Sequence, residues 1–175
     1  REEIEQRKKA ESASERLVAI VEFSDDAIIG KDLNGIITSW NHGAEKIFGY
    51  TSNEMVGTSI IRLIPDDRRA EEDVILGKIR LGQSVQHFET LRQAKDGHLL
   101  NVAVTASPIK DTTGKVIGAS KVARDISERK RLELALQQEA DLIWASGFRY
   151  ASFLDDPRPL GLLLEDISYR VLTTE

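Results

Sequence analysis

The chain has 175 residues, of which 41% are hydrophobic and 30% are charged, and its formal net charge is −5. This composition is typical of one folded domain with flanking segments, and the negative charge disfavours non-specific binding to nucleic acid. The sequence has no cysteine, which excludes disulfides, thiolate catalysis and cysteine-ligated zinc, and no apolar run approaches the roughly 18 residues of a membrane span.

Histidine is scarce as well. His42, His87 and His98 lack the close spacing of metal ligands, so we expect no metal site. No signal peptide is visible, and a cysteine-free chain suits a reducing compartment. We therefore expect a cytoplasmic location, with no membrane insertion in this segment.

The first 23 residues predict a helix. Residues 1–16 are almost wholly polar and indicate a helical linker, which would be the incoming signalling helix if another domain preceded it. Apolar residues then recur at helical spacing, which predicts an amphipathic segment that caps the domain. They are Leu17, Ile20, Val21 and Phe23. Residues 24–26 end the helix.

A hairpin and short helices follow. The β-rich runs 27–33 and 36–40 flank Asn34-Gly35, a strong signal for a tight turn. Asn41 is predicted to cap the next helix through its side-chain oxygen. Thr51 and Glu54 form a capping box for a second short helix.

A longer helix is predicted from residue 67 to about residue 81, after the break at Pro65. Its expected buried side consists of Val74, Ile75, Leu76 and Ile79. Three strands come next, at 85–95, 99–109 and 115–126, separated by turns at Asp96-Gly97 and Thr113-Gly114. Strands grouped apart from helices predict an α+β domain with a five-stranded antiparallel sheet.

A final helix is predicted after the sheet. Ser127 is its expected N-cap, and Gly147 its expected end. One face carries Leu132, Leu136, Ala140 and Ile143. This spacing suits either a partner helix in a coiled coil or packing back onto the domain. A last short amphipathic helix is predicted at 160–172.

These elements divide the chain into four parts. Residues 1–23 are expected to form a helical linker or cap, and residues 24–126 the domain core. Residues 127–146 form the predicted output helix, and residues 147–175 are an unassigned tail.

Four stretches, read in order, carry a family resemblance. They are residues 32–41, 43–50, 95–97 and 123–130. Together they resemble a PAS domain over about residues 17–130, most closely the PAS domains that precede bacterial histidine kinases. The resemblance implies a PAS fold with helices on one face of the sheet, flanked by signalling helices. It also implies a sensory and dimerisation module, a homodimer formed through the flanking helices, and a downstream output domain. Such domains also precede cyclic-dinucleotide enzymes.

PAS domains hold ligands between the helices and the inner face of the sheet. Alternation along the last three strands predicts which residues face inward. These are Gln86, Phe88, Thr90 and Arg92, then Val102, Val104 and Ala106, then Ala119, Lys121 and Ala123. The pocket candidates are Phe88, Arg92, Val102, Val104, Lys121, Ala123, Ile75 and Ile79.

The known cofactor classes of the family are tested by the same resemblance. The flavin-binding light sensors use a cysteine, absent here, and amide side chains at the positions of Arg92, Val102 and Ala123. The haem sensors use a histidine on the long helix, where residues 70–73 have none. We therefore expect no flavin of the light-sensor type and no haem. A different flavin mode stays open, in which Trp40 would take part, and an unknown small ligand is possible.

Lys121 on the inward face needs a partner, because an unpaired buried ammonium is costly. It forms an internal ion pair, reaches water through its aliphatic stem, or serves as the counter-charge of a small anionic ligand.

No catalytic motif is present, since the chain lacks GxSxG, a phosphate-binding glycine loop and a Walker lysine. We therefore predict that this chain is not an enzyme. The resemblance implies that Arg124, Asp125 and Ser127 fix the junction between the last strand and the output helix, and so relay a signal. The alternative is a constitutive dimerisation module without a ligand. The small residues Ala106, Ala119 and Ala123 leave room in the pocket and favour a ligand.

Overall fold

The computed structural model describes residues 2–154, with side chains from residue 3 to residue 144. Residues 1–128 and 129–175 fall into two separate compact units. The first unit contains the whole sheet.

A five-stranded antiparallel sheet lies at the centre of the first unit. Its spatial order is β2 (Ile37–Trp40), β1 (Ala27–Asp32), β5 (Val116–Asp125), β4 (Leu99–Lys110) and β3 (Val85–Gln93). The turn between β1 and β2 contains Gly35 at φ 80°, a conformation that favours glycine. The Asp32 carboxylate accepts the N–H groups of Asn34 and Ile36 and holds this turn. The predicted α+β fold and the predicted hairpin are confirmed.

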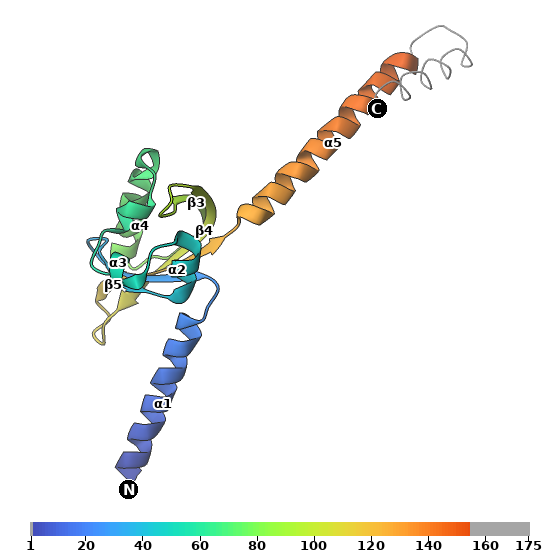
Figure 1. Ribbon diagram of the computed structural model, residues 1–175. Coiled ribbons are helices and arrows are strands. Elements are labelled where there is room, and N and C mark those ends of the chain that lie inside the picture. The colour runs from blue at the N-terminus through green and yellow to red at the C-terminus, as the bar shows by residue number, and fades with distance from the viewer. Residues whose placement is uncertain (1, 155–175) are drawn as a thin grey trace. The chain divides into compact units, whose positions relative to one another are not determined.

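Short helices cover one face of this sheet (Figure 1). They are α2 (His42–Phe48), α3 (Ser52–Met55), two 3-10 helices (Ile60–Leu63 and Asp66–Arg68) and α4 (Ala70–Arg80). Both predicted caps are confirmed. Asn41 accepts the N–H of Ala44, and the Glu54 carboxylate accepts the N–H of Thr51 at 2.9 Å.

The N-terminal segment is one continuous helix, α1 (Glu2–Glu22). It is tied to the domain where it ends, because the Asn41 amide donates to the backbone carbonyl of Val21 at 2.7 Å. Apolar residues near its C-terminal end and just after it lie largely in solvent, including Leu17, Ile20, Val21 and Phe23. The prediction that these side chains cap the domain is therefore wrong, since they remain exposed.

The predicted long helix begins at Ala70, later than expected, after the second 3-10 helix. Ile75, Leu76 and Ile79 are buried as predicted, but Val74 is 60% exposed. The core position on this side of α4 belongs to Glu72, which is buried. A hydrophobicity pattern places Val74 in the core because it cannot foresee that a carboxylate, that of Glu72, is buried there.

A β-bulge interrupts β3. The pairing with β4 shifts between Val85, opposite Ala106, and Phe88, opposite Val104. His87 takes a positive φ of 50° within this bulge. The extra residue leaves Gln86 exposed and turns Val85 toward the core side instead. The prediction that Gln86 faces inward is therefore wrong, whereas Thr90 and Arg92, beyond the bulge, are buried as predicted.

The C-terminal helix α5 runs from Ser127 to Leu154. Gly147 therefore does not end it, and the predicted boundary at residue 146 is too early. A single glycine inside a helix costs only about 1 kcal/mol, which the surrounding helix formers offset. Ser127, predicted as the N-cap, is instead the first residue of the helix. The helix predicted at 160–172 lies outside the described residues.

Candidate functional site

The predicted pocket residues lie on the inner face of the sheet and on α4, as expected from strand alternation. Those on the sheet are fully or nearly buried, apart from Phe88, which is partly buried. Phe88 packs against a small cluster that includes Ile75 and Ile79, whereas Val102, Val104 and Ala123 belong to a larger one. Six of the eight candidates therefore divide between two apolar clusters, and the other two, Arg92 and Lys121, are buried charged residues outside both clusters. The eight do not line one pocket.

Two hollows correspond to this division. A small cavity of about 10 Å³ is lined by Arg92, Val104, Lys121 and Ala123 from the sheet, and Phe48, Ile60 and Leu63 lie among its other walls. A wider hollow of about 360 Å³ lies between α4 and β3, against Ile75, Val85 and Phe88. Val102 and Ile79 line neither. The room expected from the small alanines is largely filled by bulky neighbours.

A buried carboxylate, that of Glu72, lies between two buried lysines. Lys31 on β1 and Lys121 on β5 share the inner face, since Lys31 is paired with Ala119, two residues before Lys121. Lys31 donates a hydrogen bond to Glu72 Oε1, and the Lys121 ammonium lies 3.5 Å from Oε2. Of the readings that the sequence left open for Lys121, the structure shows the internal ion pair.

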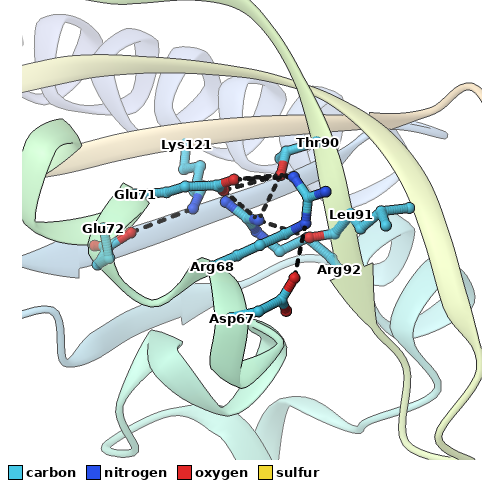
Figure 2. Close-up of polar contacts among 8 residues, drawn as sticks. All are labelled: Asp67, Arg68, Glu71, Glu72, Thr90, Leu91, Arg92 and Lys121. Carbon is cyan, nitrogen blue, oxygen red and sulfur yellow. Dashed lines mark hydrogen bonds and ion pairs between the residues drawn. The ribbon is translucent and has the colours of Figure 1, made fainter.

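The neighbouring acid, Glu71, has its own partners (Figure 2). Its Oε2 accepts a hydrogen bond from Arg92 Nη1 at 2.9 Å, and its Oε1 lies 3.2 Å from Arg68 Nη1. The Thr90 hydroxyl donates to the same carboxylate at 2.9 Å. Glu71 and Glu72 stand in the first turn of α4, where the helix dipole favours negative charge.

The pKa values follow from this packing. Burial is the main cause that lowers the pKa of Lys121 to about 7, with the charges of Lys31 and Arg92 acting in the same direction and the attraction of Glu72 opposing them. Burial also lowers the pKa of Lys31. Burial alone would raise the pKa of Glu71, but hydrogen bonds from Arg92 and Thr90 outweigh it and hold that pKa below its ordinary value. The cluster thus favours the ionised form of Glu71 and disfavours the charged forms of Lys31 and Lys121.

Sequence reasoning missed four members of this cluster, namely Lys31, Arg68, Glu71 and Glu72. Lys31 had a usable signal, because alternation places it on the same face as the buried Ala27 and Ile29. The acids had a weaker one. An acidic pair at a helix start is usually exposed, and only the buried lysines on the facing strands make a counter-charge necessary.

The predicted relay residues meet where β5 passes into α5. Asp125 Oδ1 accepts the N–H of Ser127 at 2.8 Å, and the Ser127 hydroxyl accepts the N–H of Asn101 on β4 at 3.1 Å. The N–H of Ile126 donates to the Asn101 carbonyl at 2.9 Å. Arg124 forms an ion pair with Asp26, in the link between α1 and β1. The start of α5 is therefore anchored to two strands.

Trp40, invoked for a second flavin mode, is buried in the core. Its indole N–H donates to the Tyr50 carbonyl, and its ring lies 5.7 Å from that of Phe48. This is the packing of a structural tryptophan. Among the described residues, no group of three or more histidine, aspartate or glutamate side chains is placed to hold a metal ion.

None of the helices within residues 2–154 combines the length and the apolar character needed to cross a membrane.

Comparisons with known proteins agree with this architecture. The PAS fold family model matches residues 15–126. The chain is 29% identical over 119 residues to the signal transduction histidine-protein kinase AtoS of Escherichia coli (strain K12), a match covering 68% of this chain and 19% of that kinase.

Two solved structures are similar as well. A PAS domain from Colwellia psychrerythraea has a TM-score of 0.61 and 25% identity, covering 66% of this chain and 98% of that one. The PAS domain of an HTR-like protein from Haloarcula marismortui has a TM-score of 0.59 and 26% identity, covering 70% and 98% of the two chains.

Proposed function

The chain belongs to the PAS fold family, as its motifs predicted, and we propose that its domain relays a conformational signal through α5 to an output domain. The observation that carries this proposal is the anchoring of the first residues of α5. Ser127 is bonded to β4 through its hydroxyl and to the end of β5 through its N–H. A shift between β4 and β5 would move the first turn of α5. It would thereby favour one conformation of the output domain that follows α5.

A histidine-kinase output is the form of this proposal that the comparisons favour. The similarity to AtoS, a signal transduction histidine-protein kinase, supports it. The first residue of α5 is hydrogen-bonded to the sheet, so a movement of the strands would change the angle or register of α5. A helix of this kind suits a kinase output, because it carries that change to the next domain.

The proposed active form is a homodimer that pairs through α1 and α5. Leu132, Leu136 and Ile143 on α5 are each more than 60% exposed, and their spacing follows a heptad seam with Glu139 at its one polar position. Exposed apolar side chains on α1 support the same arrangement. A second copy of the chain is the partner that fits, since two identical seams are self-complementary.

The relay is tested in a receptor in which a histidine-kinase core follows α5. Asp125→Ala removes the acceptor of the Ser127 N–H, and we expect basal autophosphorylation to change by several fold while the domain stays folded. The matched control is Asp111→Ala, because Asp111 likewise accepts the N–H groups of Thr113 and Lys115, but at the far end of β5. Equal activity in both variants and the parent would contradict the relay.

A ligand-free dimerisation module is the second candidate, and the small cavity of about 10 Å³ favours it. Native mass spectrometry of the purified chain, with an absorbance scan, separates the two. A dimer with added mass or a visible band supports a ligand sensor, whereas a colourless dimer without added mass supports the ligand-free module.

A further inference from the structure

Arg92 is a buried arginine that uses only part of its hydrogen-bonding capacity. Its side chain is 2% exposed. Nη1 donates to Glu71 Oε2 at 2.9 Å, to the Thr90 hydroxyl at 3.1 Å and to the Leu91 carbonyl at 2.7 Å. Nε and Nη2 have no hydrogen-bond partner among the residues that the structure describes. Leaving such donors buried and unpaired costs free energy, so this edge needs an explanation.

The unpaired edge has a specific chemical preference. The Nε–H and Nη2–H groups of an arginine point in parallel and match the two oxygens of one carboxylate. The chain itself contains this interaction on its surface. Arg124 donates from Nε to Asp26 Oδ1 at 2.9 Å and from Nη2 to Oδ2 at 2.7 Å. Arg92 holds the same edge inside the domain, without the carboxylate.

The charges around Arg92 favour an incoming anion. Four cationic side chains, Lys31, Arg68, Arg92 and Lys121, face three carboxylates, those of Glu71, Glu72 and Asp67, which lies 3.9 Å from Arg68. The cluster therefore carries an excess of one positive charge, since four minus three is one, when Lys121 is protonated. The carboxylates of Glu71 and Glu72 are each already shared between two cations. A buried excess of positive charge is costly, and a carboxylate ligand would reduce it.

The size of the site limits the ligand. Arg92 and Lys121 line the cavity of about 10 Å³, which is room for about one water. Its helical wall includes Phe48 of α2 and Ile60 and Leu63 of a single 3-10 turn, whereas its other wall is the sheet. A ligand larger than water must therefore displace the short helical wall, because hydrogen bonds between neighbouring strands hold all five strands of the sheet together.

We propose that the unpaired edge of Arg92 binds the carboxylate of a small organic acid, with Lys121 as a second cation beside it. This inference rests on the proposed sensory function and names the class of ligand that would drive it. The acid enters by moving the 3-10 turn outward, and its carboxylate brings negative charge to the inner face of β3 and β5. β5 leads directly into the junction at Asp125.

The test uses the full chain, with sodium acetate and sodium pyruvate as probes at constant ionic strength. Acetamide, the neutral isostere of acetate, is the control ligand. Arg92→Lys keeps a positive charge beside Glu71 but loses the two-pronged edge. Arg69→Lys makes the same exchange on an exposed arginine that pairs only with Asp66 in the described structure. By calorimetric titration, we expect saturable binding of at least one carboxylate, about tenfold weaker or more in Arg92→Lys and unchanged in Arg69→Lys.

The inference is overturned if neither carboxylate binds more tightly than acetamide, or if Arg92→Lys binds as tightly as the parent. A second measurement needs no variant to fold. In the parent chain, the Arg92 Nε–H resonance should move downfield as acetate is added, and an unmoved resonance at saturation also overturns the inference.

The outcomes distinguish this inference from the relay. Binding without any change in kinase activity would contradict the relay alone. An effect of Asp125→Ala in a chain that binds no carboxylate would contradict the ligand alone.

Discussion

Arg124 binds both carboxylate oxygens of Asp26, at 2.9 and 2.7 Å, across 98 positions of sequence. Asp26 lies in the link between α1 and β1, and Arg124 lies near the end of β5, just before α5. The pair is possible because β1 and β5 are antiparallel neighbours, with Ala27 opposite Ala123. The segment that enters the domain and the segment that leaves it are therefore joined by one ion pair.

Breaking this pair should loosen the junction without unfolding the domain. Arg124 is largely exposed, so the pair adds little to global stability. In Asp26→Asn we expect an almost unchanged Tm but several-fold faster hydrogen exchange at the amides of Ile126 and Ser127. Asp66→Asn is the matched control, since it breaks another exposed pair, with Arg69, away from the junction. Equal exchange in the two variants would show that the pair does not hold the junction.

Glu72 should be far more important to stability than its neighbour Asp73. Glu72→Gln leaves the buried Lys31 and Lys121 without an opposite charge, and removing one member of a buried ion pair costs about 3–5 kcal/mol. Asp73 is an exposed acid in the same helical turn. Asp73→Asn should cost about 1 kcal/mol or less, mainly through the helix dipole. Urea unfolding measures both variants, and similar losses would contradict the assigned role of Glu72.

The stability of the domain should rise with pH above neutrality because of Lys121. Its pKa is lowered by burial from 10.5 to about 7 in the folded state. Between these values the unfolded chain binds more protons than the folded one, so the free energy of unfolding increases with pH. The slope is at most about 1.4 kcal/mol per pH unit, and below about pH 7 it vanishes because both states carry the proton.

The comparison with Lys121→Met isolates this effect, since methionine keeps the aliphatic volume without a titrating group. Urea unfolding from about pH 6 to about pH 10 should give a parent stability that climbs relative to the variant above about pH 7. A difference that stays constant or falls across this window would contradict the lowered pKa. Lys31, whose pKa is also lowered by burial, acts in the same direction and remains in both proteins.

Much of the fold was readable from turn chemistry and periodicity, and the rest depended on partners distant in sequence. Asn34-Gly35 and Asp96-Gly97 predict turns that separate neighbouring strands, because glycine accepts a positive φ. Both turns are present, with Gly35 and Gly97 at positive φ. The bulge at His87 has no such signal, since nothing in the sequence sets histidine apart there. Ile75 and Ile79 were predictable from helical spacing.

The charged part of the site was only half predictable. Lys121 was identified because strand alternation places it inward, where an ammonium needs a counter-ion. Its partner was not, because Glu72 becomes a core residue only once α4 packs over Lys31 and Lys121. Strand alternation predicts the face on which Arg92 lies. It does not predict which of its N–H groups find a hydrogen-bond partner, because that depends on the side-chain conformation.

Two glycines should respond to alanine in opposite directions. At Gly43, in α2, an added Cβ would lie 2.3 Å from the Asp26 carbonyl oxygen and 2.5 Å from that of Ser24. These are backbone atoms beside the ion-paired Asp26, so the link must shift, and overpacking of this kind typically costs about 1–3 kcal/mol. At Gly77, within α4, an added Cβ meets no atom within 4 Å among the described residues, and alanine is the better helix former by about 1 kcal/mol. Urea unfolding should therefore show Gly43→Ala destabilised and Gly77→Ala stabilised. Loss of stability in both variants would contradict the open space found beside Gly77.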